Sequence, residues 1–374
     1  MYTEQMEDKL FQQWDEFDEY DEDYSELIEM LNSEDSFRTF GDGLLFFLKK
    51  REPDLTAETA VKYIEKLCKE TDVSIIDIAS ANTLKSWFKG GPRPKKGENS
   101  RESMFALAFA LQLTPAETAE LFHKVYLDRA FDYRNKKEIV YYFCLYNKKS
   151  WQDANRLIES AENIAANKDD YTIYTSQIKS DVEAMTDESA LLAYIAKHGH
   201  NLEKKNVAAK QTMEKLLGKA NETAKEEANL PEYEGCFNGS DRDSLNFTYE
   251  VITNLSVSGD KGTKTLFKNA RLPKEIKNRF PEATTLSKKE PTYEELRKLI
   301  ILLSSYDYWF RGQKENKIIT IDDYIDDTNA YLDQSGFSLM YYGNPYDWMF
   351  LYCALSKRPL DTFRGLLAEV LDEE

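Results

Sequence analysis

The chain has 374 residues, of which 41% are hydrophobic and 13% aromatic, and its formal net charge is −18. This length exceeds one ordinary hydrophobic core and predicts two or three domains, and the apolar content excludes general disorder. The four cysteines are scattered without a C-x-x-C pair, and no apolar stretch approaches the roughly 20 residues of a membrane span. We therefore expect a soluble, cytoplasmic protein with reduced thiols and no membrane contact.

The charge is distributed unevenly along the chain. Residues 1–35, which we call the acidic segment, carry 14 acidic residues against Lys9 alone. Residues 81–101, the basic segment, contain six basic residues against Glu98 alone, a net charge of +5. The global charge therefore hides a basic surface that could attract a polyanion.

The acidic segment has the pattern of an amphipathic helix. Its apolar residues recur at steps of three and four and would form one stripe, opposite the acidic side chains. The stripe consists of Leu10, Phe11, Trp14, Phe17, Tyr20, Tyr24, Leu27, Ile28 and Leu31. Two interpretations remain open. The stripe packs on the body of the protein, or the helix binds a partner or masks a basic surface.

Residues 36–130 predict a small domain of closely spaced helices. Thr56 precedes a periodic apolar run, Asn99 and Glu102 have capping-box spacing, and Thr114-Pro115 with Glu117 combines a capping box with proline at the first helical position. Such signals mark helix starts that are only a few residues apart.

The rest of the chain is also predicted to be mainly helical. We expect a helical array over residues 131–230, an irregular junction rich in Gly and Pro over 231–291, and an aromatic-rich helical domain over 292–374. Within the junction, the apolar residues from Phe247 onward fit a strand or a helix equally well. In the last domain, helices should begin near Thr292, at Asn344-Pro345 and at Pro359. The predicted fold class is mainly α, with a possible minor β element.

The most informative motif lies in the basic segment and reads T-L-K-S-W-F-K-G-G-P from Thr83 to Pro92. On a helix, Leu84, Trp87 and Phe88 would face the core. The motif resembles the recognition helix and following turn of Cro/C1-type (XRE-like) helix-turn-helix DNA-binding proteins, over about residues 56–126. The resemblance implies a preceding helix that contains residues 75–79, and two following helices near 101–112 and 114–126.

This resemblance also implies contacts with double-stranded DNA. Four side chains would point into the major groove: Thr83, Lys85, Ser86 and Lys89. Four basic side chains would lie near backbone phosphates: Arg93, Lys95, Lys96 and Arg101. A homodimer is expected, because DNA half-sites are usually read in pairs.

Motifs for catalysis, cofactors and metals are weak or absent. The turn from Ser258 to Thr265 lacks the G-K-[ST] order of a phosphate loop, and the aspartates at 322–327 fit a solvated first helical turn. We therefore expect no enzyme, no cofactor and no metal site. The leading hypothesis is a DNA-binding transcriptional regulator whose helical C-terminal region senses a signal, dimerises or binds a protein partner. The alternative is an acidic interaction or inhibitory protein that mimics nucleic acid and does not bind specific DNA sequences.

Overall fold

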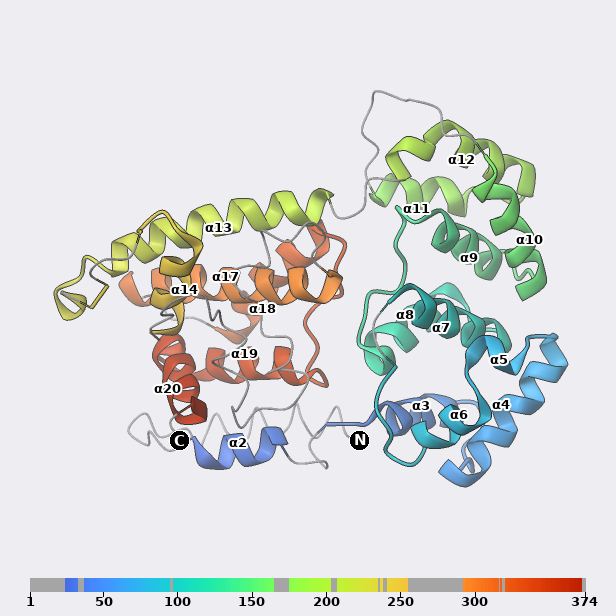
Figure 1. Ribbon diagram of the computed structural model, residues 1–374, viewed down its shortest axis with the longest axis horizontal. Coiled ribbons are helices and arrows are strands. Elements are labelled where there is room, and N and C mark those ends of the chain that lie inside the picture. Colours follow the sequence, from blue (N-terminus) through green and yellow to red (C-terminus); the bar gives the residue numbers. More distant parts are fainter. Residues whose placement is uncertain are drawn as a thin grey trace. The chain divides into compact units, whose positions relative to one another are not determined.

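The computed structural model is mainly helical, which confirms the predicted fold class (Figure 1). It describes residues 24–32, 37–94, 97–164, 175–202, 207–234, 236–237, 241–254, 292–315, 317 and 320–371. These residues contain no β-strand, and none of their helices combines the length and the apolar character that a membrane crossing requires.

The chain divides into two compact units, which are described separately below. Unit 2 is a continuous stretch, Arg38–Val207, whereas unit 1 combines Met1–Phe37 with Ala208–Glu374. The predicted helical array 131–230 is not a separate body, because residues up to 207 belong to unit 2 and the remainder to unit 1. The predicted junction 231–291 likewise falls within unit 1.

Unit 2 is built from short helices. In chain order they are α3 (Phe40–Lys49), α4 (Ala57–Thr71), α5 (Ile75–Ile78), α6 (Ala81–Trp87), α7 (Glu98–Ala110), α8 (Pro115–Glu120), the π-helix η1 (Leu121–Tyr126), α9 (Lys136–Tyr146), α10 (Trp151–Glu162), α11 (Thr175–Glu183) and α12 (Glu188–Leu202).

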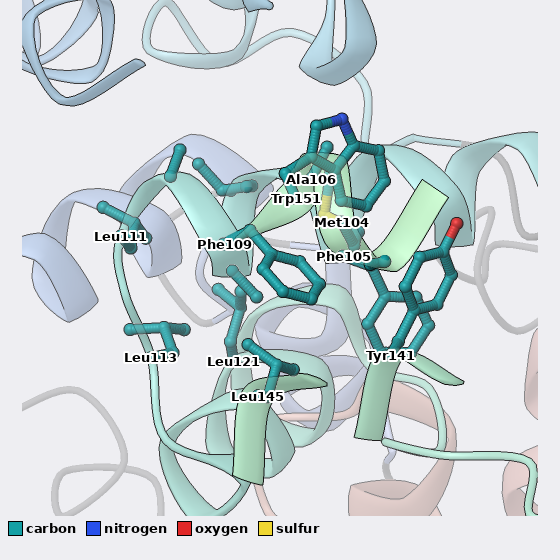
Figure 2. Close-up of a cluster of buried hydrophobic side chains, with 14 of the residues drawn as sticks. Met104, Phe105, Ala106, Phe109, Leu111, Leu113, Leu121, Tyr141, Leu145 and Trp151 are labelled. Atoms are coloured by element: carbon teal, nitrogen blue, oxygen red, sulfur yellow. The ribbon is translucent and has the colours of Figure 1, made fainter. Parts of the chain in front are cut away.

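Helix α7 is the centre of the unit 2 core (Figure 2). Every residue from Met104 to Leu111 is buried, so this helix has apolar neighbours on all sides. The ring of Phe105 stacks on Tyr141 of α9 at 4.7 Å between centroids, and Phe109 lies 5.3 Å from Trp151 of α10. Such aromatic pairs add about 0.5–1.5 kcal/mol each to the free energy gained by burial. Helix α7 therefore joins the α4–α6 region to the α9–α10 hairpin.

Local capping decides where several of these helices begin. Thr56 caps α4, and Thr114 with Glu117 forms the predicted capping box of α8. The predicted box of Asn99 and Glu102 is wrong. Helix α7 starts at Glu98 after Gly97, without a side-chain cap, and the Glu102 carboxylate instead accepts a 2.8 Å hydrogen bond from Lys137 of α9. A tertiary ion pair thus replaces the local interaction.

Unit 1 contains longer helices around one core. They are α2 (Ser25–Asn32), α13 (Val207–Glu227), the short 3-10 helix η2 (Pro231–Tyr233), α14 (Leu245–Thr253), α17 (Tyr293–Lys314), α18 (Ile321–Gln334), α19 (Pro345–Leu355) and α20 (Pro359–Leu371). The predicted starts near Thr292, Asn344 and Pro359 are confirmed. The undecided element is the helix α14, capped by Ser244, which accepts a 3.1 Å bond from the amide of Phe247.

Part of the acidic segment packs on unit 1. Leu27, Ile28 and Leu31 of α2 are buried in the unit 1 core, and Tyr24 lies against Gly365 of α20 so closely that a side chain at Gly365 would collide with its ring. The remaining residues of the predicted stripe lie outside the described residues. For α2 itself, packing on the body of the protein accounts for the apolar positions.

The burial of the cysteines predicts a large difference in thiol reactivity. Cys68, Cys144 and Cys353 are buried, and Cys236 is exposed. Burial raises the pKa of the Cys68 thiol to about 11 and that of Cys144 to about 12, so little reactive thiolate forms at neutral pH. We expect Cys236 to react with a maleimide much faster than the other three, which mass spectrometry of labelled peptides would measure. Equally fast labelling of Cys144 would contradict the described packing.

Candidate nucleic-acid interface

Helix α6 separates the predicted motif into a buried and an exposed face. Leu84, Trp87 and Phe88 at the helix end are buried in the unit 2 core. The predicted DNA-facing side chains are all exposed: Thr83, Lys85, Ser86 and Lys89. The motif therefore places two hydroxyls and the ammonium of Lys85 on the outside of α6, whose other face is fixed by packing, and the ammonium of Lys89 just beyond the last residue of the helix, Trp87.

Both ends of α6 are fixed by local geometry. At the start, the hydroxyl of Ser80 accepts a 3.2 Å hydrogen bond from the amide of Thr83. At the end, Gly90 adopts a left-handed φ of 78°, and the amide of Gly91 donates a 2.8 Å bond to the carbonyl of Ser86. A Cβ at Gly91 would lie 2.5 Å from that carbonyl oxygen, which excludes any other residue without a shift. The consecutive glycines thus close the helix.

Helix α3 holds the C-terminal end of α6 in place. A Cβ added at Gly41 would lie 1.9 Å from the carbonyl oxygen of Trp87, so only glycine permits this approach of the two backbones. Beside it, the rings of Phe40 and Trp87 meet edge to face with centroids 4.9 Å apart. The preceding helix α5 is tied to α10 by a 2.8 Å hydrogen bond from the indole of Trp151 to Asp77. The exposed side chains therefore stand on a rigid base.

The two lysines of this face are available for a ligand. Within the described parts of the chain, neither Lys85 nor Lys89 takes part in an ion pair or a side-chain hydrogen bond. Lys95 and Lys96 lie outside the described residues. Arg93 is half-buried, and its guanidinium donates a 3.4 Å bond to the backbone carbonyl of Arg38. Arg93 is thus partly directed toward the protein.

The prediction that Arg101 contacts phosphate is wrong. Its side chain is only 11% exposed and donates hydrogen bonds of 2.7–2.8 Å to the carboxylates of Glu138 and Asp128. It also donates to the backbone carbonyls of Arg129 and Ala130. Burial lowers the pKa of the Arg101 guanidinium, but the two carboxylates outweigh it and raise the pKa well above its usual value. Arg101 therefore joins α7 to α9 and to the loop before α9.

The same arrangement occurs a second time, in unit 1. Arg297 of α17 is 7% exposed and donates bonds of 2.8 and 2.7 Å to the two carboxylate oxygens of Asp347. It also donates to the backbone carbonyls of Ser338 and Leu339 at 2.9 and 3.0 Å. In each unit, a buried arginine near the start of one helix thus holds the first turn of a later helix and the loop before it.

The agreement extends to the backbone. In unit 2 the amide of Asp132 donates to the carboxylate of Glu138, at 2.6 Å. In unit 1 the amide of Tyr341 donates to Asp347, at 2.9 Å. In both units, the donor precedes the acceptor by six residues. The carboxylate of each unit thus binds the arginine and the chain that leads into its own helix.

The helices that carry the two carboxylates also match in register. Both α9 and α19 have 11 residues, and each follows an asparagine N-cap, Asn135 or Asn344, whose side chain accepts a bond from the amide two residues later. The carboxylate comes three residues after the asparagine, and a buried cysteine, Cys144 or Cys353, comes nine residues after it. We call this shared arrangement the arginine–carboxylate framework. Local periodicity does not reveal this framework, because the arginine lies 34 residues before the asparagine in unit 2 and 47 residues before it in unit 1, although the spacing N-x-x-[DE] with a later cysteine is a readable signal.

The exposed face of α6 has the chemistry of a polyanion-binding surface. Hydroxyls can donate and accept hydrogen bonds, and ammonium groups bind phosphate as point charges. No group of His, Cys, Asp and Glu side chains suited to holding a metal occurs within the described ranges. No family model, no curated protein and no solved structure matches this chain, so the assignment of this face depends on its own geometry.

Proposed function

We propose that unit 2 binds double-stranded DNA through the exposed face of α6. The observation that carries the proposal is the separation of faces on a helix fixed at both ends. Lys85 and Lys89, which have no ion-pair or side-chain hydrogen-bond partner among the described residues, stand beside the hydroxyls of Thr83 and Ser86, while the opposite side of the helix is buried. A rigid helix with exposed donors is what groove recognition requires.

The burial of Arg101 changes which residues would bind phosphates. Its guanidinium is occupied by two carboxylates, so the cationic contacts fall to Lys85 and Lys89 and to the lysines of the loop that follows. Each phosphate contact contributes a slope of about −0.9 to the dependence of log K on log salt. We therefore expect binding that is steeply salt-dependent, with most of its affinity independent of base sequence.

On this proposal the chain is a cytoplasmic transcriptional regulator. One α6 surface covers a single half-site, so a homodimer would read two half-sites about one helical turn apart. Unit 1 would then supply sensing, dimerisation or partner binding. The alternative is that the acidic segment is an exposed ligand that mimics nucleic acid. The described part of this segment, α2, packs on unit 1 and therefore does not support that alternative.

The test is duplex binding by a charge-reversed variant. In Lys85→Glu/Lys89→Glu, affinity for mixed-sequence duplex DNA should fall by about ten- to a hundredfold at low salt. The salt slope should become shallower by about 2, because each lysine–phosphate contact accounts for about one unit. Fluorescence anisotropy at two salt concentrations measures both quantities. Adding Lys95→Glu and Lys96→Glu should weaken binding further.

The matched control is Lys179→Glu/Lys197→Glu. These lysines are exposed on α11 and α12, which lie at the other end of unit 2 from α6 (Figure 1). The control makes the same change in net charge, so a general electrostatic effect would weaken both variants equally. Equal loss in the two, or unchanged binding in Lys85→Glu/Lys89→Glu, would refute the proposed role of α6.

A further inference from the structure

The two units differ in the length of chain between the arginine and the asparagine of the framework. This stretch spans 34 residues in unit 2, from Arg101 to Asn135, and 47 in unit 1, from Arg297 to Asn344. Part of the difference is helix: α7 ends nine residues after its arginine, whereas α17 continues for 17. Unit 1 therefore has about two additional helical turns, from Asp307 to Lys314, beyond the length that the framework uses in unit 2.

These additional turns line a cavity of about 260 Å³. Asp307, Tyr308 and Arg311 of α17 form one side, and Lys219 of α13 with Asp327 of α18 forms the other. Figure 1 shows the three helices side by side in unit 1. Pockets for drug-sized ligands begin at about 300 Å³, so this cavity suits a smaller molecule.

Cationic and anionic groups are balanced around the cavity. Its lining includes three cations (Lys219, Arg311 and Lys317) and three anions (Asp307, Glu315 and Asp327). Some are already paired within the protein. The carboxylate of Asp307 accepts 2.8 Å bonds from Thr223 and Arg311, and the ammonium of Lys219 donates a 3.1 Å bond to the hydroxyl of Tyr331. A ligand with a single strong charge would therefore meet repulsion as well as attraction.

Asp327 is the charged group in the cavity whose carboxylate is best placed to bind a ligand. It is half-buried, and across the described ranges its carboxylate has no hydrogen-bond or ion-pair partner. Burial raises its pKa above the usual carboxyl range, even though Lys219 and Lys317 lie near enough to lower it. A desolvated carboxylate without a partner destabilises the folded state, and a cationic donor in the cavity would offset that cost. The ring of Tyr308 lines the same space and also favours a cation, whereas the ring of Tyr331 already has the ammonium of Lys219 over it, 5.7 Å from the centroid.

We infer that this cavity binds a small zwitterion of amino-acid size. Its ammonium would bind the carboxylate of Asp327 beside Tyr308 and Tyr331, and its carboxylate would bind Lys317 and Lys219. The site lies wholly within unit 1 and does not depend on DNA binding by α6. The site would be specific to unit 1, because α7 of unit 2 lacks the additional turns that line the cavity.

The experiment is a direct binding assay with the full chain. Each proteinogenic L-amino acid is added singly at millimolar concentration, with methylamine and acetate as ligands that carry only one charge. At least one amino acid should raise the melting temperature in a concentration-dependent manner, and calorimetric titration should confirm saturable binding. Methylamine and acetate should have no such effect. A response to none of the amino acids, or an equal response to methylamine or acetate, overturns the inference.

Asp327→Asn locates the site, and Asp326→Asn is its matched control. Asp326 is the adjacent residue on α18 but is exposed. A hydrogen-bonded charge pair contributes about 1.5–3 kcal/mol, so Asp327→Asn should weaken binding about tenfold or more, while Asp326→Asn should leave it unchanged. Lys317→Met, at an exposed position, supplies a second variant that should also weaken binding. Affinity retained in both Asp327→Asn and Lys317→Met would place the ligand elsewhere and overturn the inference.

Discussion

Replacing Arg101 with alanine should lower the free energy of unfolding of unit 2 by about 3–5 kcal/mol. The change removes the guanidinium that satisfies Glu138 and Asp128, whose side chains are 7% and 4% exposed. Two buried carboxylates would lose their counter-charge, and two backbone carbonyls would lose a donor. Denaturant unfolding followed by tryptophan fluorescence measures the loss. Hydrogen exchange should increase most in peptides from α7 and α9.

The control for this prediction is Arg156→Ala. Arg156 pairs with Glu188 at 2.8 Å, but its side chain is 54% exposed. Exposed ion pairs contribute little to stability because solvent screens them, so the control should remain close to the wild type. If Arg101→Ala were as stable as Arg156→Ala and lost only DNA affinity, then Arg101 would be a phosphate contact, and the structural role assigned to it would be wrong.

Replacing Asp347 with alanine should have a comparable effect in unit 1, also about 3–5 kcal/mol. Asp347 is fully buried, and among the described residues its removal would leave the buried guanidinium of Arg297 with the carbonyls of Ser338 and Leu339 as acceptors. The amide of Tyr341 would also lose its acceptor. Burial lowers the pKa of the Arg297 guanidinium, and the variant removes the Asp347 carboxylate that raises it. A guanidinium nevertheless keeps its proton in proteins, so Arg297 would stay charged and buried without its counter-charge. Exchange should increase in peptides from α17 and α19.

Asp243→Ala is the corresponding control, because Asp243 pairs with Lys225 at 2.7 Å while its side chain is 84% exposed. We expect the stability to stay close to that of the wild type, because solvent screens an exposed ion pair. The comparison also tests the framework as a repeated element. If Arg101→Ala were strongly destabilising and Asp347→Ala were not, the two arrangements would share geometry without sharing a structural role.

The framework also suggests how the two units came to differ in their surfaces. In unit 2, the segment before the arginine helix presents the exposed face of α6, where Lys85 and, just past the helix end, Lys89 have no ion-pair partner within the described part of the chain. In unit 1, the arginine helix is extended and lines a cavity with charges of both signs. The same buried ion pair can therefore support two different surfaces, because it fixes the helices and leaves their ends and connections unconstrained.

The sequence by itself determined the features that depend on neighbouring residues. Thr114 with Glu117 and Thr292 with Glu295 start helices as predicted, since each capping interaction is formed within one turn. The orientation of α6 also followed from local pattern, because the side chains that must be buried, Leu84 and Trp87, leave only the opposite face exposed.

Tertiary structure alone decided the features that depend on distant residues. Arg101 has the charge that a phosphate contact requires, but its side chain is buried, where it donates a hydrogen bond to Glu138, 37 residues away in the sequence. The segment at Phe247 had both periodicities, and packing in the unit 1 core selected the helix. Asp327 likewise becomes part of a cavity only because the fold brings it near Lys219 and the added turns of α17. The sequence does not distinguish a charged side chain that is solvated from one that is buried. Only the fold determines whether a counter-charge lies beside it.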